Sequence, residues 1–416
     1  MLAVFCYALL FPGYFAFHLL VFSIQVPYFG WFTGLSIVSA SILLPGYFRK
    51  INGHGYTTKE TLTHFAVFIF FGSCFIAAAI NHILAKSDYV STSGAAWTIS
   101  SLATMAALYL AGYLLPSRIA TRQLLVFFAL FSIQVAAVLY FFDPNLGRME
   151  MPFYADGNMI NYQGAARSIF FTGIIIVAAI SNRSLSLALM AIIIGSLYFT
   201  GSRTELFLAI AALSIWVLLN LTRNILVISM SAALVLIPAA YFLKDKIGDR
   251  IVPNLSQDAS LTMRGEFLYK GLEGIYKSPI YGDYMGQVRD FGETGAYIHN
   301  ALSVWQQFGI MPFLIYISLC TFSVIYATKA VLSGERSTTA KLLMYVSLIS
   351  IVAVVFTKSI TWPIPALAWG LACSLMRERR IARRSDHLAS VSPQQPKFPA
   401  TQRLYKPRTQ PQSQGR

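Results

Sequence analysis

The sequence predicts an all-α, polytopic integral membrane protein of about twelve transmembrane helices. Hydrophobic residues make up 56% of its 416 residues and charged residues only 12%, and the mean hydropathy is +0.59. This composition lies outside the range of ordinary soluble domains. A membrane-spanning helix needs about 20 mostly apolar residues, and such stretches recur from Met1 to Met376. Stretches such as Ile225 to Leu243 are apolar on nearly every face, which favours helices over a β-barrel.

Apolar stretches between polar breaks predict the spans in order. They are expected near residues 2–25, 28–48, 61–83, 96–115, 123–142, 166–181, 184–200, 205–221, 225–243, 297–327, 340–357 and 361–376. The sixth and seventh are short and are separated only by Asn182 and Arg183, so a merged span, eleven in all, is the alternative. No Lys or Arg precedes Arg49, and the apolar stretch continues past Pro12, which indicates an uncleaved first span rather than a signal peptide.

The distribution of charge predicts which side of the membrane each loop faces. Twelve spans place both termini on one side, and the sequence RERRIARR after Met376 marks that side as cytoplasmic. The outer side then receives one long hydrophilic segment, residues 244–296, in which seven basic and eight acidic residues nearly cancel. The inner loops carry most of the other Lys and Arg residues, as the positive-inside rule requires.

The chain therefore divides into a transmembrane domain, residues 1–376, and a basic cytoplasmic tail, residues 377–416. The tail holds ten basic and two acidic residues, so it supplies +8 of the net charge of +15. Its basic cluster is expected to attract anionic membrane lipids, and the net charge is not a signal for nucleic acid. From Ser385 onward the tail is rich in Pro, Gln and Arg and poor in apolar residues, which predicts disorder.

Two charged residues interrupt the apolar pattern in the stretch YFTGSRTELFLAI, residues 198–210. Arg203 and Glu205 are expected at the outer end of the seventh and eighth spans, with Gly201 and Ser202 forming the turn. An arginine costs roughly 3 kcal/mol at the centre of the bilayer and less near its surface. One explanation is an interfacial anchor paired with Glu205, but the two residues differ by about 200° around a helix and would point apart. The other explanation is a functional site.

The outer segment contains SLTMRGEFLYKGLEGIYKSP, which predicts an amphipathic helix that ends before Pro279. Its expected apolar face consists of Leu268, Leu272, Ile275 and Tyr276. Ser260 or Thr262 would cap the helix, and Arg264 would lie in its first turn. A cation is disfavoured there, whereas an anion would meet both the helix dipole and the guanidinium. Arg264 is therefore a candidate anion ligand, with an arginine exposed to solvent as the alternative.

The stretch YIHNALSVWQQFG, residues 297–309, is expected to open the tenth span. On a helix, His299, Ser303 and Gln306 would form a polar stripe that begins at the membrane surface. Histidine titrates near neutral pH and is the usual proton acceptor for a hydroxyl nucleophile. Packing at the membrane interface is the alternative role for His299.

Two arginines and a histidine on one membrane face could hold a diphosphate while a hydroxyl is deprotonated, because arginine binds phosphate oxygens through two parallel hydrogen bonds. No DxD, HExxH, P-loop or dinucleotide-binding glycine motif occurs. The four cysteines form no CxxC pair. The sequence thus predicts neither a metal site nor a cofactor.

These motifs resemble the O-antigen ligase and O-antigen polymerase family of bacterial membrane glycosyltransferases. The matching residues are the GSRTE turn at residues 201–205, an R-x3-L motif from Arg264 to Leu268, and an H-x9-G motif from His299 to Gly309. The twelve-span layout and the long outer segment before His299 match as well, so the likeness covers most of residues 1–376. The tail after Ser385 falls outside it.

The resemblance implies a glycan donor carried on undecaprenyl diphosphate and an acceptor hydroxyl of lipid A-core or of another lipid-linked glycan. It implies a location in the bacterial inner membrane, with the active site facing the periplasm. Carried over by position, Arg203 and Arg264 would bind the diphosphate, and His299 would orient or deprotonate the acceptor. Tyr162, Gln163 and Arg167 are further candidates for donor contact. No metal, cofactor or ATP is implied, because the donor already contains an activated bond.

A transporter or flippase for lipid-linked glycans is the alternative from another class. It would carry charges at mid-bilayer or broken helices in paired positions. The unusual charges of this sequence are instead expected at one face of the membrane. The motifs do not separate a ligase from a polymerase.

Overall fold

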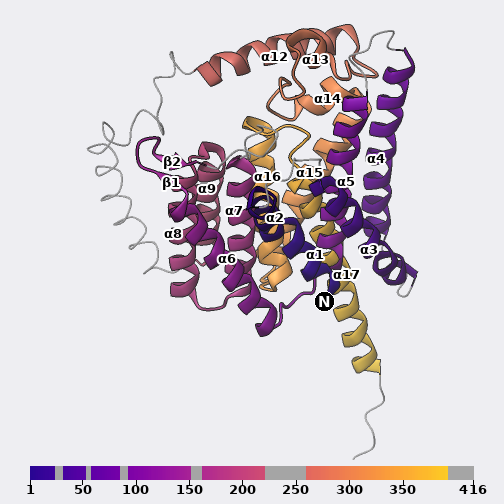
Figure 1. Ribbon diagram of the computed structural model, residues 1–416. Coiled ribbons are helices and arrows are strands. Elements are labelled where there is room, and N and C mark those ends of the chain that lie inside the picture. Colours follow the sequence, from indigo (N-terminus) through magenta and orange to yellow (C-terminus); the bar gives the residue numbers. More distant parts are fainter. Residues whose placement is uncertain (24–30, 53–57, 85–91, 151–161, 221–258, 392–416) are drawn as a thin grey trace, which may run out of the picture. The chain divides into compact units, whose positions relative to one another are not determined.

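The computed structural model describes residues 1–23, 31–52, 58–84, 92–150, 162–220 and 259–391, which are mostly helical (Figure 1). The predicted ninth span, 225–243, and the start of the outer segment lie outside the described residues, as do residues 392–416. The chain divides at Arg377 into two units, residues 1–377 and 378–416.

The first predicted span is two helices, α1 (Leu2–Leu10) and α2 (Pro12–Ser23), which meet at an angle of 52°. The predicted first span is therefore bent rather than one continuous helix, because Pro12 has no N–H to donate and suits the first turn of a helix. The other helices are α3 (Trp31–Asn52), α4 (Thr58–Leu84), α5 (Thr92–Leu114), α6 (Thr121–Tyr140), α7 (Tyr162–Ala179), α8 (Arg183–Thr200), α9 (Arg203–Leu219), α12 (Ala259–Lys277), α13 (Gly286–Phe291), α14 (Leu302–Phe308), α15 (Ile310–Leu332), α16 (Thr338–Phe356) and α17 (Ile364–Val391). A short hairpin, β1 (Phe142–Asp143) with β2 (Arg148–Met149), follows α6.

Seven of the described helices are long and apolar enough to cross a membrane, and the bent pair α1–α2 would make an eighth. The seven are α4, α5, α6, α7, α8, α15 and α16. The protein is therefore an all-α, multi-pass membrane protein, and a total of twelve spans stays a prediction. The helices α7 and α8 are separate rather than merged, and the Asn182 side chain caps α8 by accepting from Leu185 N at 3.1 Å.

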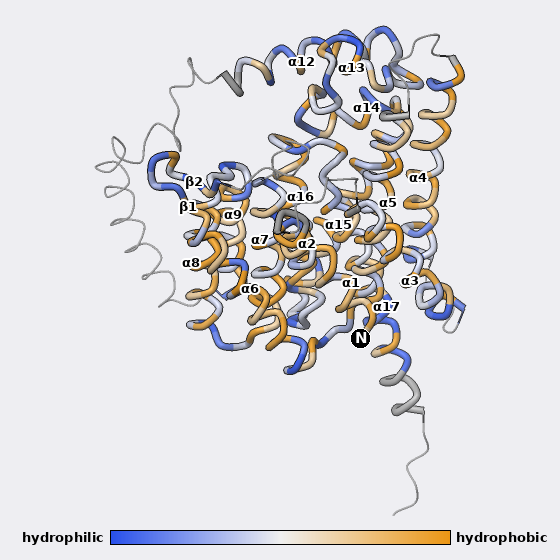
Figure 2. Tube along the Cα trace, viewed as in Figure 1, coloured by the Kyte–Doolittle hydropathy of each residue, from blue (hydrophilic) through white to orange (hydrophobic). Residues whose placement is uncertain are grey.

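Helix α7 is central to the bundle, because most of its residues are buried against α2, α6, α8, α9 and α16. Helix α6 shows the opposite pattern and exposes large apolar side chains such as Leu125 and Ile133. An exposed apolar face of this kind suits contact with lipid. The long helices are apolar along most of their length, whereas α12 and α13 carry many hydrophilic residues (Figure 2).

The predicted span at residues 297–327 is broken at Gly309, which separates α14 from α15. Gly309 has φ +85°, and a Cβ there would collide with the carbonyl oxygen of Ile280. Only glycine accommodates both the positive φ and this close backbone approach. The loop after α12 is held to the break, since Ile310 N donates to Pro279 O at 3.1 Å. The glycine of the H-x9-G motif therefore has a structural role.

The buried face of α12 differs from the predicted apolar face, of which only Ile275 is buried. Leu268, Leu272 and Tyr276 are exposed, and the buried positions are Phe267, Gly271, Gly274 and Ile275. The small glycines allow α12 to approach its neighbours closely, which a scale of side-chain hydrophobicity does not detect. The helix also begins at Ala259, before either predicted cap, so Arg264 lies in the second turn rather than the first.

Helix α17 continues to Val391, past the predicted end of the last span at Met376. The first part of the basic tail is thus helical, and the prediction of disorder from Ser385 is wrong for residues 385–391. Disorder in residues 392–416 stays a prediction, because these residues lie outside the described part of the chain.

Candidate functional site

His299 lies in the irregular segment between α13 and α14, not on a helix. Its ring is half-buried beside Phe267 of α12 and Tyr297, with ring centroids 6.0 Å and 5.5 Å away. Burial, together with the positive charges of Arg264 and Lys358, lowers the pKa of His299 to about 4. His299 is therefore neutral at pH 7 and free to accept a proton.

Hydrogen bonds hold this segment and the start of α14 against the end of α16 and the loop that follows it. Ala301 N donates to Val354 O at 2.6 Å, and Ile360 N donates to the hydroxyl of Ser303 at 2.9 Å. Ser303 was predicted to share a polar stripe with His299 and Gln306, and that prediction is wrong. Gln306 instead accepts from Ile298 N at 3.1 Å, so both polar side chains fix the loop.

Lys358, in that same loop, forms a buried ion pair with Glu205 of α9. Its Nζ lies 2.6 Å from Glu205 Oε1, and the exposed fractions of the two side chains are 12% for Lys358 and 2% for Glu205. The Ser202 hydroxyl donates to the other carboxylate oxygen of Glu205. Glu205 thus has two partners, neither of which is Arg203.

Further cations lie close to this pair. Burial lowers the pKa of Lys358, Glu205 opposes that change, and the charges of Arg167 and Arg264 reinforce it. Arg167 comes from α7, Glu205 from α9 and Arg264 from α12. We call Arg167, Glu205, Arg264, His299 and Lys358 the cationic cluster. With neutral His299 it holds three positive charges and one negative charge, a net charge of +2.

Of the residues predicted from sequence, Arg264, His299 and Arg167 are brought together in the cationic cluster. Arg203 is exposed and is the first residue of α9. It lies in the same helical turn as Glu205. The turn before it has the predicted form, because Gly201 adopts φ +75°.

Tyr162 and Gln163 begin α7. The guanidinium of Arg148 lies 5.8 Å from the centre of the Tyr162 ring, and a Cβ on Gly201 would come within 2.7 Å of the Arg148 Cβ. Arg148 therefore connects Tyr162 to the turn that precedes Arg203. The side chain of Gln163 is exposed.

Arg167 also faces the first helices of the chain. Its guanidinium lies 5.8 Å from the centre of the Tyr14 ring, a distance within the range of cation–π attraction. Arg167 and Ser168 line a small cavity of about 20 Å³, which is enough for a water molecule. Arg167 therefore lines this cavity and also interacts electrostatically with Lys358.

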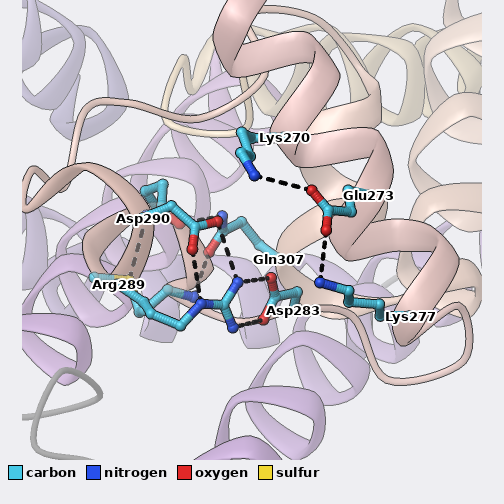
Figure 3. A network of polar contacts seen from close by, with 9 residues as sticks. Lys270, Glu273, Lys277, Asp283, Arg289, Asp290 and Gln307 are labelled. Carbon is cyan, nitrogen blue, oxygen red and sulfur yellow. Dashed lines mark hydrogen bonds and ion pairs between the residues drawn. The ribbon is translucent and has the colours of Figure 1, made fainter.

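Ion pairs organise the segment that carries Arg264 (Figure 3). Arg289 donates to both oxygens of Asp283, at 2.8 and 3.1 Å, and also to Asp290. Glu273 accepts from Lys277 at 2.7 Å and from Lys270 at 3.1 Å, which lowers the pKa of Glu273 to about 2. The side chains of Glu273, Lys270 and Lys277 are exposed, so their ion pairs contribute little to stability.

Sequence reasoning missed Lys358 and found no role for Glu205. The signal was present, because Lys358 is a lone basic residue between two apolar stretches, 340–357 and 361–376. An isolated charge at a predicted membrane boundary is costly, and a partner should have been sought for it.

No family model matches the chain, and a search of curated proteins finds no match either. Among the described residues, no group of three or more His, Cys, Asp or Glu side chains could hold a metal ion. The fold and the site together define a helical, multi-pass membrane protein with a cationic cluster at helix ends.

The lowered pKa of His299 makes a specific prediction for activity. If neutral His299 accepts a proton, turnover should stay constant on the acid side down to about pH 5 and fall as the pH approaches 4, where His299 becomes protonated. An unperturbed histidine would instead give a midpoint near about pH 6.5. Initial rates of product formation across this range test the prediction, and an acid-side midpoint near 6.5 would contradict it.

Proposed function

We propose that this protein is a metal-independent glycosyltransferase of the O-antigen ligase or polymerase type. It transfers a glycan from undecaprenyl diphosphate to a sugar hydroxyl of lipid A-core or of another lipid-linked glycan, at the periplasmic face of the bacterial inner membrane. The observation that supports this best is the position of His299, neutral and outside the spans, beside Arg264 and Lys358. A proton acceptor next to fixed positive charge suits a reaction in which a hydroxyl attacks and an anion leaves.

The reaction balances with these residues alone. The acceptor oxygen bonds to the anomeric carbon of the donor sugar and gives its proton to His299. The bond between that carbon and the diphosphate oxygen breaks, and the electron pair leaves with undecaprenyl diphosphate. Arg264 and Arg203 bind the diphosphate and stabilise the charge that develops on it.

Arg203→Lys is expected to keep the fold and the membrane level of the protein and to lose most transfer activity, roughly tenfold or more. An ammonium retains the charge but cannot bind two phosphate oxygens through a planar fork. Arg203 is exposed, so the substitution removes no core packing. Initial transfer rates, normalised to protein in the membrane, measure the effect. Full activity in this variant would remove Arg203 from the site.

Deletion of the gene in its native host, followed by gel analysis of surface glycans, tests the proposed function and separates its two forms. Loss of a ligase leaves bare lipid A-core while polymer accumulates on the lipid carrier. Loss of a polymerase leaves core that carries single repeats, and loss of an exopolysaccharide polymerase leaves lipopolysaccharide unchanged. Unchanged glycans of every kind would contradict the proposal.

Transport of a lipid-linked glycan is the second candidate, and two observations favour it. The helices α1 and α2 form a broken span, and broken helices are common in transporters. In α4, the nearly buried Glu60 lies 4.0 Å from His64, and ionisable groups inside a membrane domain often mark a transport pathway. Glycan transfer is preferred because the cationic cluster lies at helix ends.

A further inference from the structure

The pair formed by Lys358 and Glu205 is poorly explained as a device for stability. Replacing a buried ion pair by neutral side chains is often neutral or stabilising, because both charges must leave water. The free-energy cost of burying the Lys358 charge is higher here, because the positive charges of Arg167 and Arg264 also oppose it. Lys358 has one carboxylate partner and interacts electrostatically with two further cations, an arrangement that an anion would complete.

The geometry leaves Lys358 able to bind such an anion. An ammonium has three hydrogens, and the contact with Glu205 uses one of them. Glu205 is itself fixed from two sides, by Lys358 on Oε1 and by the Ser202 hydroxyl on Oε2. The backbone of Lys358 is held where α16 ends, with its N–H donating to Ala353 O at 2.7 Å. The ammonium is thus placed in advance, beside Arg264 and His299.

We propose that Lys358 binds a phosphate group of the donor diphosphate together with Arg264, and that Glu205 is a positioning residue that keeps Lys358 charged and in place before the donor arrives. This inference rests on the proposed function, because the ligand it names is the diphosphate of that reaction. It gives a role to Lys358 and to Glu205, for which the sequence motifs predicted none.

The charges that face Lys358 give Glu205 a measurable effect. The ammonium interacts electrostatically with Arg167 of α7, Arg264 of α12 and the neutral His299. Its carboxylate partner, Glu205, comes from α9 and is bound by Ser202, the residue before that helix. Burial and the two arginines already lower the pKa of Lys358, and Glu205 is the group that opposes them. Without the carboxylate charge the pKa of Lys358 falls further, so its positive charge is lost as the pH rises through that lower value.

The first test uses a double variant, Glu205→Gln with Lys358→Met, in the full-length protein in lipid nanodiscs. The net charge of the site is unchanged, and no buried charge is left unpaired. Calorimetry with inorganic pyrophosphate is expected to give affinity lower by roughly tenfold to a hundredfold, the effect of losing a hydrogen bond to a charged group. The matched control is Glu273→Gln with Lys277→Met, an exposed ion pair on α12, which should leave affinity unchanged.

Wild-type affinity in the double variant, with its melting temperature preserved, would overturn the role of Lys358. So would a wild-type protein that binds no pyrophosphate. Transfer of glycan from a lipid-linked donor separates this failure from failure of the proposed function. A wild type that transfers glycan while the double variant binds pyrophosphate normally refutes the inference alone, whereas a wild type without transfer refutes the function.

The second test uses Glu205→Gln alone, which keeps the hydrogen-bonding shape and removes the charge. The ratio of its pyrophosphate Kd to that of wild type should rise with increasing pH, and taking the ratio cancels the titration of pyrophosphate itself. Adding Lys358→Arg should abolish this rise, because arginine stays charged. A ratio that is constant with pH, or a rise that persists with arginine, would overturn the role of Glu205.

Discussion

Replacing His299 by alanine should reduce glycan transfer by roughly a hundredfold to ten-thousandfold, the usual contribution of a general base. Binding of the lipid-linked donor should stay close to that of wild type, because the imidazole is neutral at pH 7 and contributes no charge to the diphosphate. The half-buried ring packs beside Phe267 and Tyr297, so some loss of stability is also expected. Single-turnover rates and donor affinity, measured on the same preparation, separate these effects.

The matched control is His82→Ala, at an exposed position near the end of α4. It should leave both transfer and donor binding unchanged. His299→Gln adds a second check, because glutamine fills much of the same space but accepts no proton at neutral pH. If donor affinity falls in parallel with transfer in both His299 variants, the histidine binds the donor and is not the base.

Arg264→Lys should lower transfer by roughly tenfold to a hundredfold and weaken donor binding as well. Lysine keeps the positive charge that depresses the pKa of His299 and Lys358, so the electrostatic environment of the cluster is largely preserved. What is lost is the planar fork that binds two phosphate oxygens. The experiment therefore measures the geometry of the contact rather than its charge.

Arg183→Lys is the control for this variant, since Arg183 is an exposed arginine near the start of α8, as Arg264 is near the start of α12. It should behave as wild type. The acid-side pH profile of Arg264→Lys should also match that of wild type, because the charge near His299 remains. Wild-type transfer by Arg264→Lys would mean that Arg264 makes no bidentate contact with the donor.

The fold class could be predicted from sequence because long apolar stretches have few structural solutions in a membrane. Breaks within those stretches were harder to predict. Pro12 divides the first predicted span, and Gly309 divides the tenth because the backbone of Ile280 approaches it. The first break has a local cause that the sequence contains. The second depends on a contact between distant segments.

The candidate site was predictable only in part. Arg264 and His299 could be chosen from residue type and spacing, and the structure places them together. The partner of Glu205 could not be chosen, because Lys358 is 153 positions further along the chain (358 − 205). Helix geometry did indicate that Glu205 points away from Arg203, and the ion pair with Lys358 agrees with that expectation.

We propose that the protein transfers glycan and does not merely transport it. The most direct measurement reconstitutes the full-length protein in liposomes with a labelled glycan on a polyprenyl diphosphate and an acceptor glycolipid. Wild type is expected to move the label to the acceptor and release polyprenyl diphosphate, and His299→Ala is expected to do neither. Label that crosses the bilayer still attached to its carrier, equally in wild type and His299→Ala, would contradict the claim.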